Sequence, residues 1–404
     1  MTSTVELRAA IPASQDEALA IATELAAAFR DGAARRDAEL ILPGDEVEEM
    51  TRRGLYGLTV PAWLGGPDLP MSAVAEVLRI LATGDPNLAQ LPHSHYVYVN
   101  LLRCCGSRDQ QRELLSAVRD GARFGNAQAE AGTRTPDQIR TSIVPDGSGY
   151  VITGEKFYCT GAWFAHIIPV LARGQDGAAY AVFVPRTARG LTVLDDWAGL
   201  GQRTTASGTV RLEGVRVGPG AVVARDPVFG GPTTYGAFAQ LMHAAIDAGI
   251  ARGALDEAAA FVRAKARPWF EAGVDKAADD PLLVQRAGEL AVTVRAAETL
   301  LADAGRQLDA AEGERSAGRL DAQQAGAASI AVAIAKAAAD RAAVDTASAL
   351  FELGGTRSAA AGLNLDRHWR NARTHTLHDP VRWKLQHIGR WTLTGTGPPR
   401  HGQL

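Results

Sequence analysis

The chain of 404 residues has little of several features that mark whole classes of protein. It contains only three cysteines, two of them adjacent at Cys104 and Cys105, which argues against a disulfide framework and favours a reducing compartment. Charged residues make up 22% and nearly cancel to a formal net charge of -3, so the charge points neither to nucleic acid nor to a membrane as partner. Because the sequence also has no long apolar run and no N-terminal signal pattern, we expect a cytoplasmic protein.

Two common ligand-binding patterns are absent as well. No spacing of Cys and His residues matches a metal site, so we expect no metal. No GxGxxG pattern lies between a predicted strand and a predicted helix, and Gly199-Leu200-Gly201 lacks the third glycine. A built-in nicotinamide-binding domain is therefore not expected.

The periodicity of apolar residues divides the chain into three parts. Apolar residues recur at spacings of three and four up to about Arg119 and again from Tyr235 onward, which predicts helices. Between Phe124 and about Val223 the period is closer to two, which predicts strands. We expect an N-terminal helical domain at 1–122, a middle β-domain at 123–230 and a C-terminal helical bundle at 231–404.

The segment from Trp369 to Lys384 crowds titratable and aromatic side chains where a helix is predicted to end. Pro380 lacks an N–H group and disfavours helical geometry in the residue before it. His378 and Asp379 are therefore expected at a break between two helices, where binding and catalytic sites are often built. A buried, hydrogen-bonded histidine beside a capping aspartate is the structural alternative.

Three segments of the β-rich part resemble the flavin-contacting segments of the acyl-CoA dehydrogenase superfamily. They are Phe124-Gly-Asn-Ala-Gln-Ala-Glu130 (segment 1), Gly154-Glu-Lys-Phe-Tyr-Cys-Thr-Gly161 (segment 2) and Gly201-Gln-Arg-Thr-Thr-Ala-Ser-Gly208 (segment 3). Together with the order of helices, strands and helices, the resemblance covers essentially the whole chain. It implies an α+β fold with an N-terminal helical domain, a middle β-barrel domain and a C-terminal four-helix bundle, and a flavin between the last two.

Within the superfamily the chain is most similar to flavin-dependent monooxygenases, in particular SfnB-type sulfur-acquisition oxidoreductases and dibenzothiophene monooxygenases. Asp195-Asp196-Trp197, Ala266-Arg-Pro-Trp269, Asp366-Arg-His-Trp-Arg-Asn371 and Leu377-His-Asp-Pro380 carry this similarity. The resemblance implies catalytic side chains at His95, Thr160 and His378. The flavin contacts that we expect are Tyr96, Asn126, Tyr158, Thr160, Trp197, Ser207 and Arg267.

These residue types suit a flavin site. The ring system needs an apolar slot and fixed hydrogen-bonding groups, which Tyr158, Thr160, Trp197 and Ser207 offer. The phosphate needs a positive charge, for which Arg267 is the first candidate and Arg203 or Arg357 the alternatives. Ordinary core packing of the tryptophan and turn hydroxyls bonded to their own backbone are the structural alternatives.

Two histidines compete for one position in the predicted site. His93 and His95 lie two residues apart after a proline that can open a helix, so they cannot share a helical face. At most one of them is expected to point into the site. The resemblance selects His95, while the residues themselves leave the choice open.

The leading hypothesis is a two-component monooxygenase. It would receive reduced FMN from a separate flavin reductase and use molecular oxygen, through a flavin C4a-peroxide, to oxidise a small apolar organosulfur compound in sulfur acquisition. FMN is expected rather than FAD because the similar enzymes use FMN and no adenine-binding fingerprint can be read. The exact substrate stays open.

Two other functions are weighed against it. An acyl-CoA dehydrogenase-type oxidoreductase needs a base, and the glutamate common in that family aligns with Asp379, which is one methylene shorter and precedes Pro380. The third hypothesis is a flavin-fold protein that binds a ligand without turnover. For the assembly we expect a homotetramer, as the superfamily usually forms, because the Ala-rich stretch after Gly326 permits close helix packing between subunits.

Overall fold

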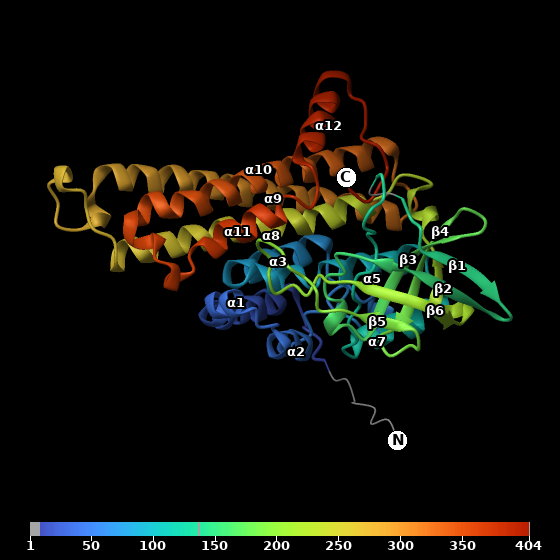
Figure 1. Cartoon of the computed structure of the whole chain (residues 1–404). Helices are drawn as coiled ribbons and strands as arrows, with labels where there is room; N and C mark the ends of the chain where they lie inside the picture. The colour runs from blue at the N-terminus through green and yellow to red at the C-terminus, as the bar shows by residue number, and fades with distance from the viewer. Residues whose placement is uncertain (1–8, 136–137, 404) are drawn as a thin grey trace.

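The computed structural model describes residues 9–135 and 138–403. Its first part is helical, the middle part holds one sheet, and long helices complete the chain (Figure 1). The first helices are α1 (Gln15–Glu39), α2 (Gly44–Arg52), α3 (Met71–Gly84), α4 (Pro86–Gln90), α5 (His93–Cys105), α6 (Arg108–Gln110) and α7 (Ser116–Arg119), with a π-helical turn at Gln111–Leu115.

The strands are β1 (Ser142–Asp146), β2 (Gly149–Lys156), β3 (Ile167–Gly174), β4 (Ala179–Pro185), β5 (Leu191–Val193), β6 (Val210–Val217) and β7 (Val222–Ala224). They form one sheet in the order β5-β6-β2-β1-β3-β4-β7. The β1–β3 pair is parallel and the other pairs are antiparallel. The sheet is curved, as expected of a barrel-like domain, but in the described ranges its hydrogen-bonded ladder ends at the edge strands β5 and β7.

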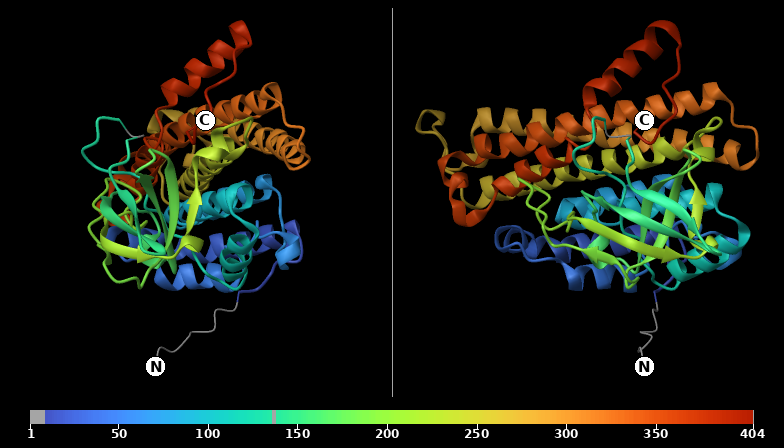
Figure 2. Two further views of the ribbon diagram at one scale, coloured as in Figure 1. Left: turned by 90° about the vertical axis from the view of Figure 1, so that its right-hand side faces the viewer. Right: turned by 45° about the vertical axis from the view of Figure 1, so that its right-hand side comes forward.

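The last part contains α8 (Tyr235–Ala264), α9 (Pro281–Ser316), α10 (Ala322–Gly354), α11 (Asp366–His375) and α12 (Val381–Thr394). Figure 2 shows the bundle of α8, α9, α10 and α11 lying across both the N-terminal helices and the sheet, with α12 projecting from it. In the described part of the chain, none of these helices is long and apolar enough to cross a membrane.

The core explains why α8 is apolar almost all round. Nearly every residue from Tyr235 to Ala251 is buried, because α3 packs on one side of α8 and α10 on the other. The small side chains of α10 allow it to approach α8 and α9 closely. Gly355 follows α10 with a φ angle of 62°, which glycine adopts easily, and the helix ends there.

A buried ion pair holds segment 1 against strand β2. The Lys156 ammonium lies 2.6 Å from the Glu130 carboxylate and also donates to the Gln128 carbonyl at 3.2 Å. Glu130 accepts further hydrogen bonds from the backbone N–H and the hydroxyl of Thr141. The side chains of Lys156 and Glu130 are 0% and 5% exposed, so neither charge has water as an alternative partner.

We predict that Lys156→Met lowers the free energy of unfolding by about 3–5 kcal/mol, because it leaves the Glu130 carboxylate buried without a counter-charge. Urea unfolding of the two proteins measures the difference. The double variant Lys156→Met with Glu130→Gln is the control and is expected to recover part of the loss. A single variant within about 0.5 kcal/mol of the wild type would show that the pair does not hold this segment.

Candidate active site

Segments 2 and 3 bring three hydroxyl groups into one chain of hydrogen bonds. The Thr205 hydroxyl donates to the Gln202 carbonyl at 2.9 Å, so its oxygen accepts from Ser207 at 2.7 Å. The Ser207 oxygen in turn accepts from Thr160 at 2.7 Å. Because each hydroxyl has one hydrogen, this direction uses the hydrogen of Thr160 inside the protein and leaves its lone pairs for an outside donor.

Aromatic and amide side chains lie beside this hydroxyl chain. The rings of Tyr158 and Trp197 meet edge to face at 5.9 Å between centroids, and Tyr158 is 63% exposed. The Trp197 N–H donates to the Gln202 carbonyl at 2.6 Å, and the Asn126 amide donates to the Tyr158 carbonyl at 3.2 Å. An exposed tyrosine beside a fixed tryptophan gives the apolar surface that a flat ring system needs.

The backbone around these side chains is strained. Tyr158, Gln202 and Ala206 all have positive φ angles, of 54°, 51° and 45°. Such angles are uncommon in residues with a side chain and cluster where a site holds groups in defined positions. The side-chain amide of Gln202 is also buried, and neither of its polar atoms has a partner among the described residues.

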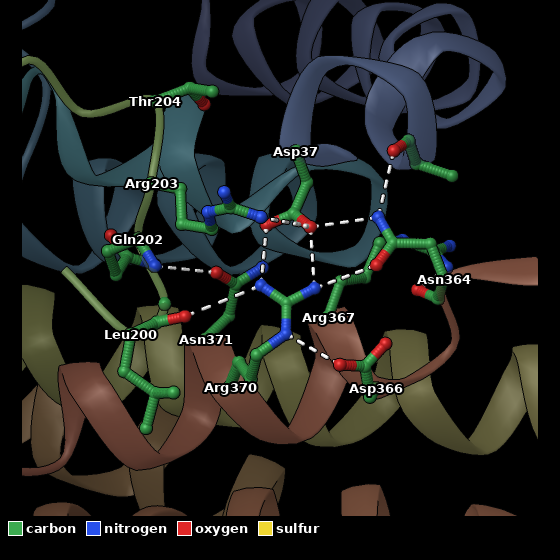
Figure 3. Close-up of polar contacts among 12 residues, drawn as sticks. Asp37, Leu200, Gln202, Arg203, Thr204, Asn364, Asp366, Arg367, Arg370 and Asn371 are labelled. Atoms are coloured by element: carbon green, nitrogen blue, oxygen red, sulfur yellow. Dashed lines mark hydrogen bonds and ion pairs between the residues drawn. The ribbon is translucent and has the colours of Figure 1, made fainter. Parts of the chain in front are cut away.

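Segment 3 docks on α11, as Figure 3 shows, and also on α4. The Gly201 N–H donates to the Thr374 hydroxyl at 2.8 Å, and the Gln202 N–H donates to the side-chain amide oxygen of Asn371 at 2.7 Å. The Thr204 N–H donates to Asn87 of α4 at 3.2 Å. Three backbone donors of one segment are thus bound by side chains from two other parts of the chain.

A hollow of about 520 Å³ opens beside this junction. Arg203 of segment 3 lines it, together with Ser358, Asn364 and Arg370 from the other side. Arg370 is paired with Asp37 at 2.6 Å, whereas the Arg203 guanidinium lies 3.9 Å from the same carboxylate (Figure 3). Of these two arginines, Arg203 therefore has the weaker ion pair within the protein.

Four histidines form a second cluster, here called the histidine cluster: His93 of α5, His243 of α8, His375 of α11 and His378 after it. The His93 and His243 rings stack at 3.9 Å between centroids, and the His378 ring lies 4.0 Å from that of His243. His243 Nδ1 lies 3.1 Å from His375 Nε2, and His375 Nδ1 lies 2.6 Å from a carboxylate oxygen of Asp247. Only His378 is open to solvent, with a side chain that is 49% exposed.

Burial sets the charge states of this cluster. It lowers the pKa of His93 to about 3 and the pKa of His243 well below its usual value, so both rings are neutral near pH 7. For Asp379 burial alone would raise the pKa, but the neighbouring His378 and Lys384 and the hydrogen bond from Gln240 hold the pKa below its usual range. The cluster thus has two neutral imidazoles, those of His93 and His243, beside the charged carboxylate of Asp379.

The hydroxyl chain and the histidine cluster face the same junction. A Cβ atom on Gly161, the residue after Thr160, would lie 3.2 Å from the Leu91 carbonyl. Leu91 stands two residues before His93, and its neighbour Gln90 lies 3.1 Å from His375 Nε2. The end of α4 and the turn before α5 therefore join segment 2 to the cluster.

Comparison with protein-family models assigns each part of the chain. Residues 14–122, 126–215 and 241–383 match the N-terminal, middle and C-terminal domains of acyl-CoA dehydrogenase. The chain belongs to the acyl-CoA dehydrogenase family. The expected family and α+β fold are thereby confirmed.

Several relatives that match this chain over nearly its whole length are named as monooxygenases. A dibenzothiophene monooxygenase of Rhodococcus erythropolis is 32% identical over 96% of this chain and 95% of its own length. The "Probable FMNH2-dependent monooxygenase SfnC" of Pseudomonas putida is 34% identical over 94% of this chain and 96% of its own. The crystal structure of FMN-bound TdsC from Paenibacillus sp. A11-2 superposes with a TM-score of 0.90 at 31% identity, covering 96% of this chain and all 100% of TdsC.

In this family member, most of the predicted site residues come together. Thr160, Ser207, Tyr158, Trp197 and Asn126 lie in one group, and His378 lies at the predicted break, between the end of α11 and the start of α12.

The structure corrects the expected orientation of His95 and Tyr96. The His95 Nε2–H donates to the Tyr56 carbonyl at 2.8 Å, and its Nδ1 accepts from the Phe124 N–H at 2.9 Å. Tyr96 is fully buried, and its hydroxyl donates to the Leu55 carbonyl. Because this face of α5 is turned into the core, backbone groups bind the polar atoms of both His95 and Tyr96. His93 is the histidine that faces His378.

Arg267 lies apart from the other predicted residues. It is exposed and lies just after the end of α8. With a rise of 1.5 Å per residue, the end of this helix lies roughly 30 Å from His243 along the helix axis. Within one chain the structure therefore separates Arg267 from the hydroxyl chain. A phosphate contact from Arg267 requires a different copy of the chain.

Sequence reasoning missed His243, His375 and Asp247. A signal for two of them was present, because His243 and Asp247 are spaced by four residues in the first half of α8, which is otherwise mostly apolar. Polar residues on the buried face of such a helix need partners from elsewhere in the chain. His375 is that partner.

We predict that His95→Ala lowers the free energy of unfolding by about 2–4 kcal/mol, since it leaves the Phe124 N–H and the Tyr56 carbonyl buried without partners. Urea unfolding measures the change, and His387→Ala on the surface of α12 serves as a control with little expected effect. An unchanged stability of His95→Ala would contradict the structural role and return His95 to the list of catalytic candidates.

Proposed function

We propose that this protein is a two-component monooxygenase of the cytoplasm. It takes reduced FMN from a separate flavin reductase and uses molecular oxygen to oxidise a small apolar organosulfur compound in sulfur acquisition. The relatives named for FMNH2 and for dibenzothiophene support the cofactor and the substrate class. Reduced FMN, when bound, supplies the electrons that activate oxygen.

The direction of the hydroxyl chain is the observation that carries this proposal. Reduced flavin has a hydrogen on N5, which makes that atom a donor. Thr160 uses its own hydrogen toward Ser207 and presents lone pairs, so it suits a reduced flavin as the acceptor. The neighbouring Asn126 amide and the Tyr158 and Trp197 rings fit the carbonyls and the flat face of the same group.

His378 is the group that we assign to proton transfer. Its Nδ1 lies 3.2 Å from the Asp379 carboxylate, which orients the ring and leaves Nε2 for exchange with a ligand or water. The buried rings of His93 and His243 pack beside it and exclude water from that side. A water-poor pocket protects an activated oxygen species from wasteful release.

The same contacts disfavour the dehydrogenase alternative. The Asp379 side chain is 2% exposed, and its Oδ2 accepts from the Gln240 amide at 2.8 Å as well as facing His378. A base that removes a proton from a bound thioester must reach the substrate. Asp379 points instead toward α8, where it orients its neighbour.

Replacing His378 tests the assignment directly. We predict that His378→Ala keeps the fold and FMN binding, while product falls by about 10²–10⁴-fold and hydrogen peroxide rises, because proton delivery is lost but oxygen is still reduced. Product formed per oxygen consumed is the measurement, with His387→Ala as the matched surface control. A wild-type ratio would mean that His378 is only scaffolding.

Thr160 is tested by a substitution that keeps its volume. We predict that Thr160→Val raises peroxide release as His378→Ala does, but by a smaller factor, because one acceptor is removed while the shape is nearly conserved. Binding of reduced FMN is measured in the same experiment and is expected to weaken by about 1 kcal/mol. Unchanged coupling and unchanged binding together would remove Thr160 from the flavin site.

For the assembly we propose a homotetramer in which Arg267 reaches the flavin of a neighbouring copy. The loop that carries Arg267 also exposes Trp269 and Phe270, which are 61% and 77% accessible in the single chain. Large aromatic side chains exposed together mark a surface that binds another protein.

We predict that Arg267→Ala weakens FMN binding by about 1.5–3 kcal/mol through loss of a charge-assisted contact to the phosphate. Titration of FMN measures the affinity, and sedimentation checks the assembly. Arg203→Ala is the matched comparison, because Arg203 lines the hollow beside segment 3. Unchanged affinity in Arg267→Ala with a loss in Arg203→Ala would assign the phosphate to Arg203 instead.

A further inference from the structure

Three possible metal ligands converge at the solvent-facing end of the histidine cluster. One nitrogen each from His243 and His378 and one carboxylate oxygen from Asp379 all lie within 4.8 Å of one another. His243 comes from the buried middle of α8, while the other two come from the break between α11 and α12. No sequence spacing reveals this group because its members come from distant segments.

Two of the three residues have a buried atom without a partner. His243 Nδ1 lies 3.1 Å from His375 Nε2, and His375 Nδ1 lies 2.6 Å from Asp247. His243 therefore uses Nδ1 inside the protein, and its Nε2 is the nitrogen left for a ligand. In the described part of the chain that atom has no hydrogen-bond partner, and neither has Asp379 Oδ1.

Outer contacts hold both residues in place. The Asp247–His375 pair lies behind His243, which is the arrangement that commonly orients a metal-binding imidazole. The Gln240 amide fixes the other oxygen of Asp379 at 2.8 Å. Buried polar atoms without a partner are costly, and a cation bound by them removes that cost.

We propose that His243, His378 and Asp379 bind one divalent transition-metal ion. Two imidazoles and one carboxylate, with water as a further ligand, suit Zn²⁺. His378 is the ligand that moves inward on binding, because it is half-exposed whereas the other two are held by their outer contacts. A bound ion occupies His378, which is then lost to proton transfer, so under the proposed function the ion is an inhibitor.

Calorimetric titration of Zn²⁺ into the full-length protein, freed of metal by chelator and without flavin, tests the site. We expect one ion per chain. His378→Ala and Asp379→Asn are each expected to weaken binding at least about tenfold, while His387→Ala binds as the wild type does. His378→Ala alters a half-exposed side chain, so its result does not depend on tolerance of a buried change.

The proposal is overturned if the wild type takes up no Zn²⁺, or if His378→Ala and Asp379→Asn bind it as tightly as the wild type. Because the titration needs no flavin, oxygen or substrate, it is decided separately from the monooxygenase assignment. Inactivity toward organosulfur compounds would sink the proposed function and leave the metal site standing.

Discussion

The docking of segment 3 between α4 and α11 is the constraint on which the site depends. Its backbone N–H groups are bound by side chains of the N-terminal helices and of the bundle, so one loop of the β-domain joins all three parts of the molecule. The fit is close: a Cβ atom on Gly201 would lie 2.0 Å from the Arg370 carbonyl oxygen. Any larger residue there would push the hydroxyl chain away from the histidine cluster.

An ion pair supports this junction from behind. Arg370 binds Asp37 of α1 through two nitrogens and Asp366 through a third, as Figure 3 shows. Burial alone would raise the pKa of Asp37, but Arg370 and the Asn364 amide hold it below its usual value. The Asp37 carboxylate therefore stays charged and holds α11 in place through Arg370. The next residue, Asn371, is then in position to bind Gln202.

The histidine cluster continues into the core of the bundle as a row of charges. Lys336 of α10 donates to Asp247 at 2.9 Å and to Asp340, and all three side chains are almost wholly buried. Apolar residues of the same size are often at least as stable in such positions. The polar row is therefore a weak source of stability, and what it secures is the position of His375 and His243 at its end.

The sequence by itself determined what depends on local chemistry. Periodicity placed the helices and the β-rich middle, and strands β1 to β6 lie between Phe124 and Val223 as predicted. His378 and Asp379 lie at the predicted break, after α11 ends at His375 and just before Pro380, which caps the start of α12. Segments 1 to 3 were recognisable because each resembles a short segment of the acyl-CoA dehydrogenase superfamily.

Tertiary structure alone decided which side chains share the site. The choice between His93 and His95 depended on the rotation of α5 about its axis, and that is set by packing against α8 and the Phe124 backbone. His243 and Asp247 looked like isolated polar residues until α11 brought His375 against them. Arg267 was grouped with the flavin contacts, yet the length of α8 carries it away from them within one chain. Such contacts join segments far apart in sequence, and no local pattern records which of them the folded chain brings together.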